Sequence, residues 1–156
     1  MKKYRYNSDK KMIRKANRND YREIYRLTQV LEGEALDEPG FQEVFDVCME
    51  KDLFLVKEID GEVHGFIHVA FTPQLARAGY IAEVQELIID EAYRERGYGK
   101  SLLQEAKKIC TEKGISIIEV LSSDYRTRAH HFYESNGFVK SGYRFFNEEY
   151  WKEKRK

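Results

Sequence analysis

Apolar residues along the chain follow two patterns, which predict strands and helices. Segments rich in β-branched and aromatic residues, bounded by Gly, Pro, Asn or Asp, are typical of strands. The predicted strands are residues 12–16, 53–59, 62–72, 80–90 and 116–121. Asp60-Gly61, between the second and third of them, is a hairpin turn signal. The sequence therefore predicts an antiparallel hairpin within a larger sheet.

Apolar residues at spacings of three and four predict helices in the remaining segments. Two of these helices follow the first strand, one after the cap Asn19-Asp20 and one after a loop that Pro39-Gly40 closes. A third helix ends at Lys113-Gly114, and a fourth spans residues 127–136. Residues 138–146 alternate loosely and are predicted to form closing strands.

This order of elements predicts an α/β (α+β) fold in which helices cover a mixed sheet. At 156 residues the chain is expected to form a single domain, residues 11–150. Residues 1–10 are predicted to be a flexible arm, and residues 151–156 a basic tail.

The composition limits the classes of binding partner that we expect for this protein. The 27 basic and 27 acidic residues balance, which gives no general attraction to nucleic acid or to anionic membranes. Apolar runs stay well short of the ~20 residues of a transmembrane helix, and the N-terminus does not resemble a signal peptide. Cys48 and Cys110 are far apart in the sequence and are expected to be reduced. These features indicate a cytoplasmic protein.

The segment from Arg94 to Ser101 joins a predicted strand to a predicted helix and is rich in glycine and basic residues. Gly97 and Gly99 allow the backbone to turn tightly and to approach a ligand closely. The start of the helix adds N–H groups and the positive end of its dipole. The segment therefore suits a phosphate or pyrophosphate, although an ordinary turn with solvated basic residues is the alternative.

Three known phosphate-binding motifs match this segment to different degrees. A Walker A loop requires glycine where Arg94 stands, and a dinucleotide fingerprint requires glycine where Leu102 stands. The pattern Arg/Gln-x-x-Gly-x-Gly/Ala is matched in full by Arg94, Gly97 and Gly99. In this the segment resembles the coenzyme A pyrophosphate loop of the GNAT N-acetyltransferases.

A second block strengthens the resemblance, because it lies at the distance from the loop that this family shows. It is similar to the family's last motif and reads Arg126-x-x-Ala129-His130-x-Phe132-Tyr133-x-x-x-Gly137-Phe138. Within the family, residues 80–146 most resemble the bacterial aminoalkylphosphonate N-acetyltransferases, through this block and Ile81-x-Glu83-x-Gln85-Glu86-Leu87. The N-terminal half carries no residue-by-residue match to that subfamily.

The resemblance implies the GNAT fold, a mostly antiparallel mixed sheet flanked by helices, with acetyl-CoA as co-substrate. It also implies a homodimer, because many members dimerise through their closing strands. The residues that it assigns to the coenzyme are Leu87, Ile88, Ile89, Arg94, Arg96, Gly97, Tyr98, Gly99, Lys100 and Ser101.

Acetyl transfer to an amine requires a base, stabilisation of an oxyanion and protonation of the departing thiolate. The candidate bases are Glu83 and Glu86, with Glu83 favoured, acting directly or through water. They share a face of their strand only if it bulges between them, as this family's strand does. A backbone N–H near Leu87 would bind the oxyanion, and Tyr133 would protonate the thiolate. Packing roles for these side chains are the alternative.

The histidines do not have the spacing of a metal site. His64 and His68 on one strand would lie roughly 13 Å apart at ~3.3 Å per residue. The adjacent His130 and His131 diverge on a helix. No metal is therefore expected. Direct transfer is also expected, because neither cysteine has an activating neighbour in the sequence.

These observations together predict transfer of an acetyl group from acetyl-CoA to the primary amine of a small molecule, with an aminoalkylphosphonate as one candidate. Two alternatives stay open. One is acetylation of a protein N-terminus or lysine, and the other is a non-catalytic module that binds acyl-CoA.

Overall fold

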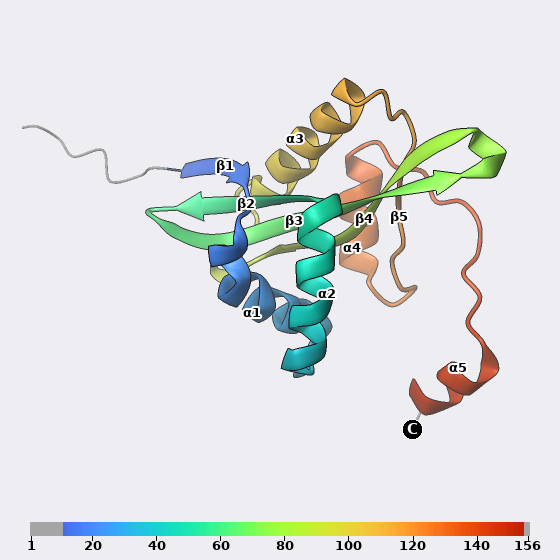
Figure 1. Ribbon diagram of the computed structural model, residues 1–156, viewed down its shortest axis with the longest axis horizontal. Coiled ribbons are helices and arrows are strands. Elements are labelled where there is room, and N and C mark those ends of the chain that lie inside the picture. The colour runs from blue at the N-terminus through green and yellow to red at the C-terminus, as the bar shows by residue number, and fades with distance from the viewer. Residues whose placement is uncertain (1–10, 155–156) are drawn as a thin grey trace, which may run out of the picture. The chain divides into compact units, whose positions relative to one another are not determined.

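The computed structural model describes residues 11–154 (Figure 1). The predicted N-terminal arm, residues 1–10, and the end of the predicted basic tail, residues 155 and 156, lie outside this part. The chain divides into two compact units, one ending at Leu121 and the other beginning at Ser122. Each unit is described by itself.

The first unit is built on a five-stranded sheet with the strand order β1-β2-β3-β4-β5. Neighbouring strands are antiparallel except for β4 and β5, which are parallel. The prediction of a mixed, mostly antiparallel sheet is thus confirmed. The strands are β1 (Lys11–Lys15), β2 (Leu53–Ile59), β3 (Glu62–Gln74), β4 (Gly79–Ile89) and β5 (Ile118–Val120).

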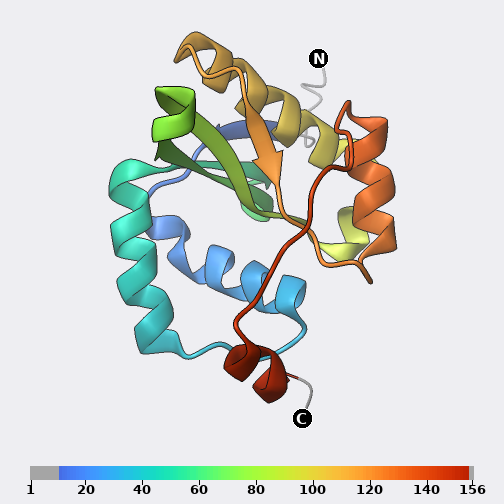
Figure 2. The same ribbon diagram turned by 90° about the vertical axis from the view of Figure 1, so that its right-hand side faces the viewer.

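Three helices pack on this sheet: α1 (Tyr21–Glu32), α2 (Glu38–Lys51) and α3 (Tyr98–Glu112). Figure 1 shows α3 on one face and α1 and α2 on the other, and Figure 2 shows the same layers after a turn of 90°. Short 3-10 helices precede α1, β4 and the glycine-containing loop: η1 (Arg18–Asp20), η2 (Leu75–Arg77) and η3 (Glu91–Tyr93).

Both faces of the sheet are apolar, because helices cover each of them. Under α1 and α2 the buried cluster is Ile24, Leu27, Phe45, Phe54, Val56, Val63, Phe66 and Ile88. The buried positions of α3 are Leu102, Leu103, Ala106 and Cys110. Their spacing of three and four places them on the side of α3 that contacts the sheet, as the periodicity predicts.

Helix α2 begins earlier than the sequence predicts. Asp37 caps it by accepting a hydrogen bond from the Gly40 N–H at 2.8 Å, and Pro39 lies in the first turn. Proline is compatible with this position because the first N–H groups of a helix have no partner within the helix. The predicted loop therefore ends at Asp37 instead of Gly40.

The second unit differs most from the prediction. Residues 139–147 contain no strand, so the predicted closing strands over residues 138–146 are wrong for the described structure. Val139, Tyr143 and Phe145 are exposed, and Gly142 adopts a left-handed backbone (φ 79°). A strand needs a neighbour for its backbone groups, and loose alternation does not specify one. The unit's helices are α4 (Thr127–Ser135) and α5 (Glu148–Lys154), of which α5 was not predicted.

No helix within residues 11–154 is long and apolar enough to cross a membrane.

Candidate functional site

Strand β4 carries a β-bulge beside the predicted base residues. His68 of β3 pairs with Glu86, and the next residue of β3, Val69, pairs with Val84. Gln85 is therefore an extra residue in β4, and its side chain is exposed. The bulge that the resemblance required lies between Glu83 and Glu86, two residues before Leu87.

The bulge places Glu83 and Glu86 on the same face of the sheet. Glu86 pairs with His68 and Glu83 pairs with Ala70, and these partners are two residues apart in an uninterrupted part of β3. Residues two apart in a strand share a face, and residues directly opposite each other share it too. If Gln85 were instead paired regularly, the two carboxylates would be three positions apart in the ladder and would lie on opposite faces.

A buried histidine connects Glu86 to a third carboxylate. His68 Nδ1 lies 2.6 Å from Glu86 Oε2, and His68 Nε2 lies 2.8 Å from Asp52 Oδ2. The side chains of Asp52 and His68 are only 5% and 8% exposed, and that of Glu86 is 30% exposed. The His68 ring stacks on Phe54 with centroids 4.1 Å apart. His68 thus contacts the Glu86 carboxylate from the protein interior, and this carboxylate remains partly exposed to solvent.

The charge of this histidine follows from its neighbours. Burial by itself lowers the pKa of His68, but the hydrogen bonds and charges of Glu86 and Asp52 outweigh burial and raise this pKa above its ordinary value. Both ring nitrogens of His68 thus have a carboxylate partner.

The edge of β4 that faces β5 is paired along only part of its length. Within the described residues, β5 pairs with β4 over Ala82–Val84. Leu87, Ile88 and Ile89 lie beyond this pairing, and on their other side they pair with β3. Their side chains are half-buried or buried, so what they can offer a ligand is their backbone.

The loop after β4 has the geometry that its glycines predict. Glu95 and Gly97 both have left-handed backbones (φ 63° and 80°), and Gly97 is the N-cap of α3. The first bond of the helix runs from the Ser101 N–H to the Gly97 carbonyl at 3.0 Å, so Gly99 and Lys100 precede it. The positive end of the α3 dipole lies at this loop.

Basic side chains surround the start of α3. Arg96 and Lys100 are exposed, whereas Arg94 donates a hydrogen bond through Nε to the Ile89 carbonyl at 2.9 Å. Arg94 thus ties the loop to the end of β4 with one nitrogen of its guanidinium. Lys57 of β2, which is buried, places its ammonium 4.6 Å from the centroid of the Tyr98 ring.

Asp90 anchors the start of this loop. Arg26 of α1 donates two hydrogen bonds to its carboxylate, at 2.7 and 2.8 Å, and His64 Nδ1 lies 2.9 Å from the same group. The hydrogen bond from Arg26 lowers the pKa of Asp90 most; burial opposes it and His64 adds to it. Helix α1 and strand β3 therefore both position the chain where it leaves β4.

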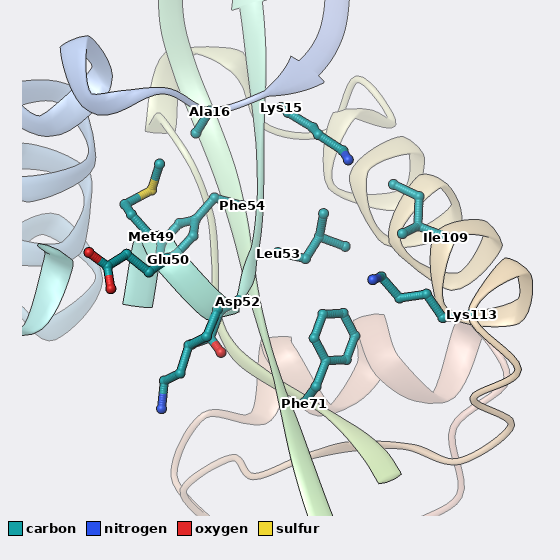
Figure 3. A pocket seen from close by; sticks show the side chains of 11 residues that line it. Lys15, Ala16, Met49, Glu50, Asp52, Leu53, Phe54, Phe71, Ile109 and Lys113 are labelled. Carbon is teal, nitrogen blue, oxygen red and sulfur yellow. The ribbon is translucent and has the colours of Figure 1, made fainter. Parts of the chain in front are cut away.

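A pocket opens beside the first residues of β2. Figure 3 shows its lining, in which Lys113 extends toward Phe71 and Lys15 extends toward Ile109. The Lys113 ammonium lies 5.2 Å from the centroid of the Phe71 ring. Asp52, which bonds His68, is also among the residues that line this pocket.

Tyr133 belongs to the second unit, in α4. Its ring packs edge-on against Phe132 and Phe138, with centroids 5.2 and 5.5 Å apart. Burial raises the pKa of Tyr133 to about 12, with Arg126 opposing. The phenol is therefore neutral across the physiological range and can donate its proton.

Sequence reasoning located Glu83, Glu86 and the glycine loop but missed Asp52, His68 and Lys57. For His68 the sequence contains one usable signal: it is a polar residue between Phe66 and Ala70, at strand positions that face α1 and α2. For Asp52 the sequence contains no such signal, because its partner His68 is 16 residues away in the chain. The hydrogen bond between them depends on how α2 leads into β2.

Comparison with known proteins places these features in a family. The model of the acetyltransferase (GNAT) family matches residues 15–138. An aminoalkylphosphonate N-acetyltransferase from Salmonella typhimurium is 28% identical over 135 residues, which cover 85% of this chain and 88% of that protein.

Solved structures share the fold. A transcriptional regulator from Bacillus halodurans has a TM-score of 0.79 and 23% identity, covering 89% of this chain and 99% of that one. An aminoglycoside N-acetyltransferase solved in complex with CoA has a TM-score of 0.78 and 15% identity, covering 90% and 95%. At these identities the likeness concerns the fold alone.

Replacing Asp90 tests its role as an anchor of the loop. We expect Asp90→Asn to lower the free energy of unfolding by about 1–2 kcal/mol at neutral pH, because the amide cannot match the two hydrogen bonds of Arg26. Since the pKa of Asp90 is lowered, its contribution is present at neutral pH and is lost as the pH falls below about 4.

Urea unfolding at several pH values measures this difference. Asp46→Asn is the matched control, because the Asp46–Arg18 pair is more than half exposed and should contribute at most about 0.5 kcal/mol. An equal effect of the two variants, or a difference that persists undiminished in acid, would contradict the assignment.

Proposed function

Since the family model spans most of its length, the chain belongs to the GNAT acetyltransferase family, and we propose that it transfers an acetyl group from acetyl-CoA directly to the primary amine of a small molecule. The observation that carries this proposal is the bulge at Gln85, which puts Glu83 and Glu86 on one face of β4. The same strand leads into the glycine loop, so the carboxylates and the proposed coenzyme site share one element.

In this proposal the coenzyme lies along β4 and ends at α3. The pyrophosphate would accept hydrogen bonds from the N–H groups at the start of α3, with Arg94, Arg96 and Lys100 supplying charge and Gly97, Tyr98, Gly99 and Ser101 shaping the loop. The pantetheine arm would bond to the backbone of Leu87, Ile88 and Ile89 as an added strand does. The end of β5 pairing at Val84 supports this placement.

In the proposed reaction each residue either transfers a proton or stabilises a charge. Glu83, directly or through water, takes a proton from the substrate ammonium, and Glu86 attracts the cation. The amine nitrogen attacks the thioester carbonyl, whose oxygen becomes negative and is bound by a backbone N–H near Leu87. The carbonyl then re-forms as the C–S bond breaks, and Tyr133 donates its phenolic proton to the departing thiolate. The second proton that the nitrogen loses as it becomes an amide restores the phenol. The raised pKa of Tyr133 supports the neutral starting state of this donor.

An aminoalkylphosphonate is the first candidate for the substrate. Its support is the motif shared by residues 80–146 and the name of the Salmonella typhimurium relative. At 28% identity over the alignment, a different small amine would also be compatible with the family. Acetylation of a peptide or protein is the second candidate activity.

The proposal also includes the domain organisation, the cellular location and the oligomeric state. We infer a single acetyltransferase domain over residues 11–150, which the family match supports because it crosses from the first unit into the second. A cytoplasmic location and a homodimer are expected for this enzyme, and the balanced charge gives it no general affinity for nucleic acid.

A panel of amines tests the activity itself. Release of free thiol from acetyl-CoA would be measured with aminoalkylphosphonates, polyamines, amino sugars and short peptides. We expect turnover with small primary amines and the highest kcat/KM with an aminophosphonate. Turnover on peptides alone would overturn the small-molecule assignment, and tight binding of acetyl-CoA without any turnover would favour a binding module.

Replacing the carboxylates tests the proposed base. We expect Glu83→Gln to lower kcat by about 10²–10⁴-fold with little change in the KM for acetyl-CoA, because the amide cannot accept the proton. Glu86→Gln should have a smaller effect, through weaker attraction of the ammonium. Glu112→Gln, at an exposed position near the end of α3, is the control and should keep full activity. A greater loss in Glu86→Gln than in Glu83→Gln would transfer the role of base to Glu86.

Removing the phenolic hydroxyl tests the proposed acid. We expect Tyr133→Phe to lower kcat by about 10²-fold or more while leaving the affinity for acetyl-CoA within about twofold, because packing of the ring is retained. Tyr143→Phe is the matched control, since Tyr143 is almost fully exposed. Unchanged kcat in Tyr133→Phe would limit Tyr133 to packing.

A further inference from the structure

Three side chains with metal-binding atoms converge at the end of α2. Cys48 and Asp52 lie four residues apart, and His68 extends toward them from β3. The cysteine sulfur, a carboxylate oxygen of Asp52 and an imidazole nitrogen of His68 all lie within 4.8 Å of one another. Neither the base and acid roles proposed above nor the coenzyme site uses Cys48 or Asp52.

We propose that Cys48, Asp52 and His68 bind a divalent transition-metal ion, with Zn²⁺ as the ion that best fits the ligands. Thiolate, imidazole and carboxylate are the three ligand types that Zn²⁺ takes in proteins. Thiolate disfavours Mg²⁺ and Ca²⁺, which prefer oxygen ligands. Three protein ligands leave a fourth tetrahedral position for water or another small ligand.

The contacts of His68 match those of a metal-bound histidine. A ligating histidine ordinarily donates its other ring N–H to a carboxylate or carbonyl, which fixes the orientation of the ring. Here His68 Nδ1 lies 2.6 Å from Glu86, and Nε2 is directed at Asp52. Stacking on Phe54 fixes the ring plane as well. The nitrogen that would bind the ion is therefore already directed at one of the other two ligands, Asp52.

Binding requires only a small adjustment of the ligands. His68 Nε2 and Asp52 Oδ2 are 2.8 Å apart because they share a hydrogen bond, and the Cys48 sulfur lies within 4.8 Å of the other two ligand atoms. Around a tetrahedral Zn²⁺ with bonds of 2.0–2.3 Å, ligand atoms lie about 3.3–3.7 Å apart. The ion would replace the proton that His68 and Asp52 share and the proton of the Cys48 thiol, and His68 Nε2 and Asp52 Oδ2 would separate by about half an ångström to 1 Å.

One of the three residues, Asp52, lines the pocket beside β2 shown in Figure 3, together with Met49 and Glu50 of α2. Cys48, which is half-buried, lies one turn back along the same helix.

Cobalt replacement tests the site in the full-length protein. Co²⁺ would be added to protein freed of metal by chelation, and the absorption spectrum recorded. We expect a near-ultraviolet thiolate-to-cobalt charge-transfer band, displaced by Zn²⁺. Cys48→Ala should abolish this band, whereas Cys110→Ala, which removes the thiol buried under α3, should keep it. The band's absence from the wild-type protein, or its loss in Cys110→Ala alone, would overturn the proposal.

Affinities for Zn²⁺ provide a second measurement. We expect His68→Gln to weaken binding by at least about 100-fold, and Glu86→Gln, which changes only the outer partner of His68, by about 10–100-fold. Circular dichroism confirms that each variant folds. If Cys48→Ala does not fold, X-ray absorption of the Zn²⁺-loaded wild-type protein decides: one sulfur with nitrogen and oxygen neighbours supports the site, and a shell without sulfur overturns it. Because these readouts measure binding, they are independent of whether the protein acetylates amines.

Discussion

The extra residue at Gln85 is the constraint on which the arrangement of the site depends. A regular β4 would turn Glu83 and Glu86 to opposite faces, one toward α3 and the other toward α1 and α2. With the bulge, both carboxylates face the side of α1 and α2. There Glu86 meets His68, and His68 meets Asp52 at the end of α2. Leaving one residue out of the strand pairing thus brings the polar groups of two strands and a helix terminus together.

A second set of contacts fixes the other end of β4. Asp90 receives Arg26 from α1 and His64 from β3, and Arg94 bonds back to the last carbonyl of the strand. The chain then reaches Gly97 and begins α3. The bulge lies within β4 and this anchor directly follows its end, so the length of β4 between them sets the separation between the carboxylates and the glycine loop.

The buried polar groups need one another. A charged histidine in an apolar layer beside Phe54 is costly unless both ring nitrogens have partners, and Glu86 and Asp52 supply them. The same pair of contacts directs one imidazole nitrogen at Asp52, and the Cys48 sulfur lies within 4.8 Å of the ligand atoms of both residues. Proton-mediated contact and metal coordination are thus two states that the same three side chains can adopt.

The sequence by itself determined the strands 53–59 and 80–90, the amphipathic helices and the glycine loop, because local periodicity and turn chemistry specify them. It also identified Glu83, Glu86 and Tyr133 as candidates. Tertiary structure alone decided that Glu86 contacts His68 and that His68 contacts Asp52. His68 and Asp52 lie 18 and 34 residues away from Glu86 in the chain, and only strand register and the path of α2 bring them together. It also decided the absence of strands over residues 139–147, because pairing requires a neighbour that alternation along one segment cannot specify.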